Sequence, residues 1–398
     1  MQILPHPWNS TAVWNQLSPH ISPQVRQPLE RLLECSNGST LSREDCLALA
    51  QTTGDELLAL AAVADILRER LVGDKITYVV NRNINFTNVC FVGCKFCAFH
   101  HGPNHPEANS FTPEQVAEKA MEAWELGATE VCIQGGLPRN LPPFYYRDVL
   151  RAIKSALPKM HIHAFSPMEI TYGVQLTGMD LRDYLSMLRD NGLDTMPGTA
   201  AEILHDDVRS LISKYKLNAE SWEEIIRTAH ECGIRTTSTM MYGHVEKPEH
   251  WVDQLLMFRS IQSDTGGFTE FVPLGFIHNN TRLFLEGHSR PGPTPEEHIR
   301  IHALARVLLA GAINNIQVSW VKMPREMSQQ CFQAGANDHG GTLMEENISR
   351  TAGASFGQYL SPEQFDERIR ELGRTPAQRN TTYSQITPRP AVMDAIAQ

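Results

Sequence analysis

The sequence predicts an α/β protein built on a (β/α)8 barrel of the TIM type, with a helical N-terminal extension and a short C-terminal tail. Two observations predict this fold. From Lys75 onward, short β-rich runs alternate strictly with amphipathic helical patterns, which demands parallel strands with helical crossovers. Eight such pairs occupy roughly 280 residues, the size of one closed barrel. An open doubly wound sheet, which shows the same alternation, is the alternative.

The strands are expected where apolar or β-branched residues cluster, namely at residues 84–87, 130–134, 161–166, 193–196, 235–241, 268–273, 316–320 and 334–338. The helices are expected between them, at residues 112–126, 142–157, 178–190, 200–213, 219–232, 248–262, 294–312 and 344–353. Thr112, Thr294 and Ser361 each precede Pro-Glu and then Gln or Glu, a pattern that caps and starts a helix.

Three segments are predicted. Residues 1–74 form a helical cap, in which Ser42 and Thr53 start two of the helices. Residues 75–373 form the barrel, and residues 374–398 form an extended or loosely ordered tail.

Composition excludes several classes of function. The 398 residues are 41% hydrophobic and 20% charged, as in an ordinary globular protein. With 35 Lys and Arg against 45 Asp and Glu, the net charge of −10 predicts no nucleic-acid partner and no anionic membrane partner. The N-terminus shows neither a basic nor an apolar leader pattern, so we expect a cytoplasmic protein.

Three of the eight cysteines stand out. The other five stand singly and are expected to be small buried residues: Cys35, Cys46, Cys132, Cys232 and Cys331. Cys90, Cys94 and Cys97 follow the first predicted barrel strand with the spacing C-x3-C-x2-C. Three such thiolates suit a [4Fe-4S] cluster that keeps one iron open. A zinc site completed by His100 is the alternative.

This spacing, with Phe96 before the last cysteine and the loop placed after the first strand of a barrel, resembles the signature of the radical S-adenosylmethionine (SAM) superfamily. The resemblance implies that Cys90, Cys94 and Cys97 bind a [4Fe-4S] cluster whose open iron holds SAM. It also implies a low-potential electron donor of the flavodoxin or ferredoxin type, whose electron cleaves SAM to a 5′-deoxyadenosyl radical. Phe96 is expected to contact the cofactor.

In the superfamily, a glycine-rich segment at the end of the second strand binds the methionine part of SAM through its backbone. Gln134, Gly135 and Gly136 hold that place here, and Leu137 stands where the superfamily usually has Glu. The backbone role therefore carries over and the carboxylate role does not. Because glycine lets the backbone approach a ligand, we expect Gly136→Val to weaken SAM binding and to spare the cluster.

Ser166, Glu202 and Arg209 are further expected cofactor contacts. Each has an ordinary structural alternative: a helix cap for Ser166, the first turn of a helix for Glu202 and a solvated helix side chain for Arg209.

Because barrel active sites lie at the carboxyl ends of the strands, polar residues there are catalytic candidates. We expect catalytic roles for Glu169, Tyr242 and His339, with His244 and Asn337 as further candidates. The alternative for each is a hydrogen-bonded structural residue.

Longer stretches, at residues 78–90, 161–170 and 335–342, resemble a group that contains two futalosine enzymes of menaquinone biosynthesis and both halves of 8-hydroxy-5-deazaflavin synthase. Ala164 and Met168 make the 161–170 stretch most similar to the half of that synthase that uses tyrosine. That resemblance implies cleavage of L-tyrosine and transfer of its hydroxybenzyl fragment to 5-amino-6-(D-ribitylamino)uracil. A second radical SAM subunit would then close the deazaflavin ring. Arg235, Arg282 and Lys322 are possible partners of the tyrosine carboxylate.

Two alternatives remain open at this point. The chain resembles the aminofutalosine and cyclic futalosine enzymes nearly as well, and a non-catalytic iron-sulfur protein would also carry three cysteines.

Overall fold

Parallel strands form the centre of the computed structural model, which describes residues 2–389. Six of them form one sheet in chain order: β2 (Asn81–Ile84), β3 (Glu130–Ile133), β4 (His161–Ala164), β5 (Thr195–Met196), β6 (Arg235–Tyr242) and β7 (Phe268–Gly275).

The remaining strands complete the ring. β1 (Lys75–Val79) is separated from β2 by Val80 alone and pairs in parallel with β8 (Asp338–Gly341). Single parallel bridges from Phe271 to Ile316 and from Gln317 to Asp338 join β7 to β8. The predicted α/β barrel is therefore confirmed. The seventh strand is reduced to these bridges, because the chain turns into the 3-10 helix η2 (Trp320–Lys322).

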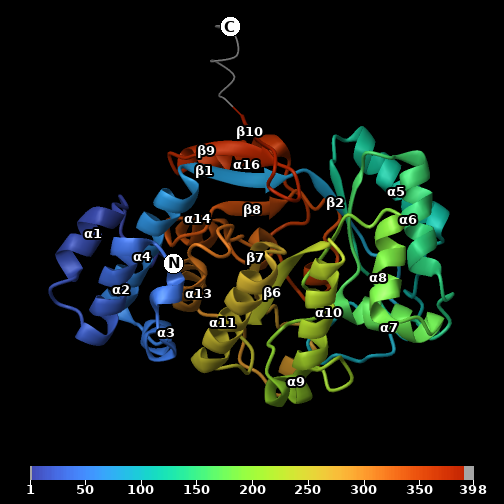
Figure 1. The fold of residues 1–398 in the computed structure, drawn as a ribbon, viewed down its shortest axis with the longest axis horizontal. Helices are drawn as coiled ribbons and strands as arrows, with labels where there is room; N and C mark the ends of the chain where they lie inside the picture. The colour runs from blue at the N-terminus through green and yellow to red at the C-terminus, as the bar shows by residue number, and fades with distance from the viewer. Residues whose placement is uncertain (1, 390–398) are drawn as a thin grey trace, which may run out of the picture.

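Helices cover the outside of this ring (Figure 1). They are α5 (Pro113–Glu125), α6 (Tyr145–Ala156), α7 (Pro167–Thr177), α8 (Leu181–Asp190), α9 (Asp206–Ile212), α10 (Ala219–Glu231), α11 (Pro248–Thr265), α12 (Arg282–Leu285), α13 (Pro295–Leu309), α14 (Arg325–Gln333), α15 (Ile348–Thr351) and α16 (Pro362–Glu371). Thr112, Thr294 and Ser361 form the expected capping boxes. The sequence patterns missed α7 and α14.

The N-terminal segment consists of α1 (Ser10–Leu17), α2 (Pro23–Cys35), the short η1 (Gly38–Thr40), α3 (Arg43–Ala50) and α4 (Gly54–Val72), at one side of the barrel in Figure 1. α4 packs against α1 and the barrel helix α13. Across residues 2–389, no single helix is long and apolar enough to cross a membrane, although α3 and α4, bent by 117°, pass on length and composition together.

The C-terminal segment is built into the barrel wall. β9 (Thr375–Arg379) pairs in parallel with β1 from Lys75 to Tyr78, and β10 (Ile386–Pro388) returns antiparallel to β9. Of the two expectations for the tail, extended chain is the one observed in β9 and β10, and these strands are paired rather than loosely ordered. Residues 390–398 lie outside the described residues. The segment boundaries at 74 and 373 remain predictions.

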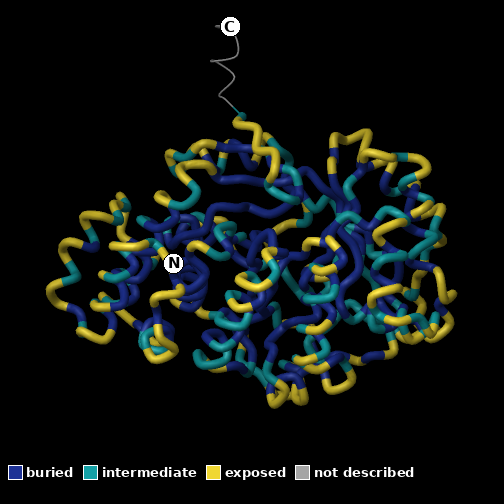
Figure 2. Tube along the Cα trace, viewed as in Figure 1, coloured by how far each residue is buried: buried dark blue, intermediate teal, exposed yellow. Residues whose placement is uncertain are grey.

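Two strands lie elsewhere than expected. The first barrel strand covers 75–84 instead of 84–87, because its polar residues, including Asn81 and Arg82, are buried by partners rather than exposed. The eighth begins at Asp338 instead of Ala334, because Gly335 turns the chain with a positive φ of 102°. Figure 2 shows the buried strands at the centre and the exposed chain on the outer helices and loops.

Candidate active site

A cavity of about 400 Å³ runs through the inside of the barrel. We call its outer end the part beside Cys90, Cys94 and Cys97, where the strands end. We call its inner end the part lined by residues nearer the starts of the strands and by the C-terminal segment: Glu130, His163, Glu270, Gln317, Arg379 and Thr381.

The cysteine loop is held by backbone bonds to three other parts of the chain. The Cys90 N–H donates to the His101 carbonyl at 3.1 Å, and the Phe91 N–H donates to the Leu137 carbonyl at 3.1 Å. The Lys95 N–H donates to the Ile212 carbonyl at 2.9 Å. This anchoring holds the loop backbone with all three thiols lining the same cavity, as a shared metal centre requires.

The chemistry of the thiols fits that centre. Burial raises the pKa of the Cys94 thiol to about 12, opposed by the nearby Lys216 ammonium, and burial also raises the pKa of Cys97. Bound iron deprotonates a coordinating thiol, so these side chains become ligands only together with a metal. Phe96 lines the cavity beside them, with the Lys216 Nζ 5.3 Å from its ring centre.

The two glycines after β3 pack against the cysteine loop. A Cβ built on Gly136 would lie 2.3 Å from the Val89 carbonyl oxygen and 3.1 Å from the Cys90 Cβ. A Cβ on Gly135 would meet the Phe86 ring at 2.6 Å. The structure therefore changes the expectation for Gly136→Val: we now expect the variant to disturb the cluster as well, because the added side chain would overlap a cysteine-bearing segment. Both glycines, and Gln134, line the cavity.

Ser166 and Glu169 form the capping box that starts α7. The Glu169 carboxylate accepts the Ser166 N–H at 2.7 Å, the Ser166 hydroxyl at 2.6 Å and, through Oε1, the Gly135 N–H at 3.1 Å. Burial raises the pKa of Glu169 to about 7. Both residues line the cavity. The hydrogen bond from the Gly135 N–H to Glu169 holds the glycine segment in place.

Glu202 forms an ion pair that sequence reasoning missed. Its Oε1 lies 2.7 Å from the Lys216 Nζ, while its buried Oε2 lies 3.8 Å from the Arg209 Nη1 and has no hydrogen-bond partner within residues 2–389. Although burial favours the neutral amine, the Glu202 carboxylate holds the pKa of Lys216 above its ordinary value. Both side chains line the outer end of the cavity, where Glu202 has a free acceptor for a ligand.

Arg209 lies behind this pair and outside the cavity lining. Its guanidinium donates to the carbonyls of Ala200, Ala201 and Leu217. Arg209 therefore does not line the cavity in which the cofactors are expected, and it is not a solvated helix side chain, because only 4% of the residue is exposed. Arg209 instead holds together the loop that carries Glu202 and Lys216.

Four of the catalytic candidates point away from the cavity. The Tyr242 hydroxyl bonds to His298 Nδ1 at 2.7 Å, and His339 lies between the rings of Phe332 and Phe365. The same holds for the buried His244 and Asn337. Direct catalytic roles for Tyr242 and His339 are therefore not supported, because strand alternation turns them toward the helix layer.

The three possible partners of a tyrosine carboxylate differ in position. Arg235 and Arg282 are exposed, and Arg282 pairs with Glu286 on the surface. Lys322 lines the cavity, and its Nζ donates to the Ser349 hydroxyl at 2.8 Å. Burial lowers the pKa of Lys322.

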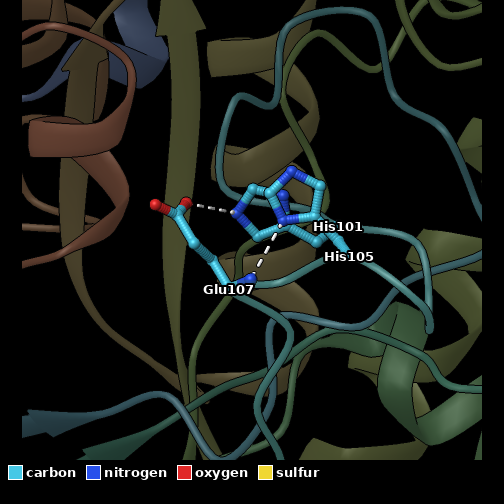
Figure 3. Close-up of side chains that lie close together, drawn as sticks. All are labelled: His101, His105 and Glu107. Atoms are coloured by element: carbon cyan, nitrogen blue, oxygen red, sulfur yellow. Dashed lines mark hydrogen bonds and ion pairs between the residues drawn. The ribbon is translucent and has the colours of Figure 1, made fainter.

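A separate group of possible metal ligands lies just after the cysteines (Figure 3). His101 and His105 stack at 4.0 Å, and His101 Nε2 lies 3.5 Å from the Glu107 carboxylate. These atoms lie within 4.8 Å of one another, outside the cavity lining. His100, the ligand of the zinc alternative, has its Nδ1 3.0 Å from the Cys97 carbonyl oxygen.

Sequence reasoning also missed the inner end of the cavity. Glu130 and Glu270 sit among apolar strand residues, and a charged residue at an inward-facing strand position was the available signal. Nothing local marked Lys216, which lies in a polar loop, or Arg379, which arrives from the far end of the chain.

The sequence of this chain is similar to those of known protein families. One family model, described as the radical SAM superfamily, matches residues 84–257, and another, described as the CofH/MqnC C-terminal region, matches residues 265–392. The chain is 53% identical over 341 residues to the FO synthase of Mycobacterium leprae. It is 52% identical over 319 residues to the 5-amino-6-(D-ribitylamino)uracil--L-tyrosine 4-hydroxyphenyl transferase of Methanopyrus kandleri.

The chain belongs to the FO synthase family of radical SAM enzymes. The match covers 80% of this chain and 86% of the Methanopyrus transferase. It covers 86% of this chain but only 40% of the Mycobacterium FO synthase, so the chain spans about two fifths of the length of that relative. The [FeFe]-hydrogenase maturase HydG of Carboxydothermus hydrogenoformans shares the fold, with a TM-score of 0.69 at 15% identity, over 94% of this chain and 84% of that one.

Membership in this family carries a [4Fe-4S] cluster and SAM as cofactors. The cavity fits both groups. Three thiols line one wall of its outer end, and a buried carboxylate oxygen of Glu202 lacks a hydrogen-bond partner in the described part of the chain. The individual roles predicted for the site residues remain predictions.

Proposed function

We propose that this protein is the tyrosine-cleaving transferase of deazaflavin biosynthesis, which joins the 4-hydroxybenzyl fragment of L-tyrosine to 5-amino-6-(D-ribitylamino)uracil. The observation that carries the proposal is 52% identity across 86% of the Methanopyrus transferase. When bound, the cluster and SAM supply the radical that removes a hydrogen atom from the substrate. In the proposed reaction the Cα–Cβ bond of tyrosine breaks, glycine imine leaves, and the hydroxybenzyl radical bonds to C5 of the uracil. The uracil radical that results gives up one electron, which returns to the electron-transfer chain, and one proton.

The outer end of the cavity suits the cofactors. In this proposal Cys90, Cys94 and Cys97 bind the cluster, and the free Oε2 of Glu202 accepts a hydrogen bond from the amino group of SAM. Lys216 pairs with the other oxygen, Oε1, and so orients that carboxylate. Enclosure by the barrel excludes water, which protects reactive intermediates from side reactions.

Lys322 is the proposed partner of the tyrosine carboxylate. It is the one of the three candidate cations that lines the cavity. Its hydrogen bond to Ser349 fixes the amine at the wall, where an incoming carboxylate would favour the charged form.

The proposal includes two further partners. A low-potential donor of the flavodoxin or ferredoxin type supplies the electron. A second radical SAM enzyme closes the deazaflavin ring on the adduct.

The test is turnover by the anaerobically reconstituted protein with reductant, SAM, L-tyrosine and 5-amino-6-(D-ribitylamino)uracil. We expect 5′-deoxyadenosine and a hydroxybenzyl-uracil adduct whose mass shifts when tyrosine carries a ring label. Lys322→Gln should raise the KM for tyrosine by about tenfold or more, since it removes a charge-assisted hydrogen bond. Lys159→Gln, an exposed lysine, is the matched control.

An absence of tyrosine-derived carbon in every uracil product would refute the assignment. Turnover of a futalosine-type substrate with comparable SAM cleavage would point instead to the menaquinone branch, which the CofH/MqnC description also covers.

A further inference from the structure

The inner end of the cavity is a buried polar cluster assembled from the barrel and the C-terminal segment. Glu130 accepts hydrogen bonds from the Asn81 amide at 2.8 Å and from the Thr381 hydroxyl at 2.5 Å. Glu270 accepts from the Tyr383 hydroxyl at 2.6 Å and from the Gln317 amide at 3.2 Å. These bonds hold both carboxylates in the cavity wall, away from the cysteines.

Arg379 does not neutralise this end. Its Nε lies 2.6 Å from Asp338 Oδ2 and its Nη2 lies 3.0 Å from Asp338 Oδ1, which makes a two-point pair. Its contact with Glu270, at 3.3 Å, is longer. Two carboxyl groups, those of Asp338 and Glu270, therefore share one guanidinium, and Glu130 makes its hydrogen bonds to neutral groups. The two carboxyl groups that line the cavity, Glu130 and Glu270, are the less compensated. His163 adds no positive charge near neutral pH, because burial lowers its pKa to about 4.

A wall of this kind selects a neutral ligand that donates hydrogen bonds. Each carboxylate has about four acceptor sites, and only some are used by the protein. Hydroxyl groups can donate to the remaining sites, whereas an anionic group would be buried beside like charges with no spare cation.

We propose that the inner end of the cavity binds the ribityl chain of the uracil substrate, with its hydroxyls donating to Glu130 and Glu270, and that these carboxylates exclude the 5′-phosphorylated form of the same compound. This inference rests on the proposed function, and it adds which residues read the sugar chain and why the chain must be free of phosphate.

The orientation follows from the positions of the reacting groups. The tyrosine fragment is released near the outer end, where the cofactors bind, so C5 of the uracil must face outward. The ribityl chain leaves the opposite side of the molecule and extends inward. Thr381 and Arg379 place the C-terminal segment in direct contact with this part of the substrate.

The experiment measures binding and turnover separately on the anaerobic, reconstituted holoenzyme. Calorimetry compares 5-amino-6-(D-ribitylamino)uracil with its 5′-phosphate, and mass spectrometry follows the adduct from each. We expect the wild type to bind the unphosphorylated compound at least about 100-fold more tightly, the scale of like-charge exclusion in a buried site.

Because burial raises the pKa of Glu270 to about 7, these measurements are made at pH 8, where its carboxyl is ionised. Glu270→Gln should then weaken binding of the unphosphorylated compound and reduce the ratio of the affinities for the unphosphorylated and phosphorylated compounds by about tenfold, because the amide removes one negative charge. Thr381→Val keeps the side-chain shape. It should weaken binding of the unphosphorylated compound several-fold and leave the ratio of the affinities for the two compounds unchanged. This variant tests the site if Glu270→Gln fails to fold. Glu118→Gln, an exposed glutamate on α5, should match the wild type.

Two failures are distinguishable. If the adduct forms and the two compounds bind equally, or if Glu270→Gln folds and leaves the preference unchanged, the inner-end assignment is overturned and the proposed function stands. If binding is selective but no adduct forms, the proposed function fails and the inner-end site stands.

Discussion

Arg209 shows how one buried side chain can build a site without touching its ligands. The guanidinium serves the carbonyls of Ala200, Ala201 and Leu217, with distances from 2.5 to 3.1 Å. Glu202 itself has a positive φ of 42°, a backbone conformation that a non-glycine residue keeps only when its surroundings enforce it. The charge beside the cysteines thus depends on an arginine one layer away.

Replacing Arg209 by Met should therefore destabilise the cofactor-free protein by about 3 kcal/mol, since three buried carbonyls lose their donors. Chemical denaturation without iron or SAM measures this effect. Arg182→Met, which removes an exposed ion pair with Glu231, should change stability little. Wild-type stability of the cofactor-free Arg209→Met protein would mean that the arginine acts through the cofactor after all.

A second prediction at this scale concerns which cysteines bind iron. Cys90→Ala, Cys94→Ala and Cys97→Ala should each lose the bound iron and the brown absorbance near 400 nm, roughly as in other thiolate-bound clusters. Cys232→Ala, which changes a buried cysteine outside the cavity lining, should keep both. The iron content of each variant is measured after anaerobic reconstitution. If Cys232 proves necessary for iron binding and one of the three cysteines does not, the ligand assignment is overturned.

At this scale the sequence identifies residues whose spacing is chemically meaningful. The sequence predicts that the three cysteines share one site, because a single loop carries all of them. His339 and Tyr242 lie outside the cavity lining, because strand alternation separates inward from outward positions by one residue. Asp338, the neighbour of His339, is the one that pairs with Arg379.

At the scale of elements, the loop after β3 and the cysteine loop form one packed unit. The Gly136 N–H donates to the Thr87 carbonyl at 2.8 Å, and the Phe91 N–H donates to Leu137. The glycine segment and the cysteines are thus mechanically coupled, and a change in one is transmitted to the other.

Gly136→Val should consequently lower both iron content and SAM affinity, because its side chain would overlap the Val89 carbonyl. Gly102→Ala is the matched control, since a Cβ there meets no atom within 4 Å. Iron assay and anaerobic calorimetry measure the two effects. Full iron content in a folded Gly136→Val protein would show that the two loops are independent.

Helix starts were predictable because the signal is local. The Thr112, Thr294 and Ser361 capping boxes lie within four residues of sequence, and all three form. β9 was not predictable, because its partner β1 lies at the other end of the barrel sequence and its strand contains Thr375 and Pro376, which carry no strand periodicity. The inner end of the cavity was missed for the same reason.

At the scale of the whole molecule, buried histidines dominate the response to acid. Burial lowers the pKa of five of them to between about 3 and 4: His163, His230, His298, His302 and His339. Since the ordinary value is 6.5, the unfolded chain takes up protons below pH 6.5 that the folded protein refuses. Their contribution to stability is therefore lost as the pH falls from 6.5 toward 4.

Glu169 and Glu270 act in the opposite direction, because burial raises the pKa of each to about 7. These five histidines and two carboxyl groups together contribute a net loss of about 4 kcal/mol per pH unit near pH 5.5. Denaturation curves at pH 7.0 and 5.5 measure this slope. His339→Leu should reduce the slope by about 1.4 kcal/mol per pH unit, and an unchanged slope would show that His339 does not titrate in this range.

The pairing of β9 with β1 has a consequence for how the enzyme is made. Translation produces β1 first, and its neighbour in the wall, from Thr375 to Arg379, comes about 300 residues later. A ribosome-bound chain that already carries the cysteine loop therefore still has an open seam beside β1, with Glu130 and Glu270 lacking Thr381, Tyr383 and Arg379. The inner end of the cavity is therefore completed only after the cysteine loop has been synthesised, and a stop codon shortly before residue 375 would spare Cys90, Cys94 and Cys97 while removing the wall opposite them.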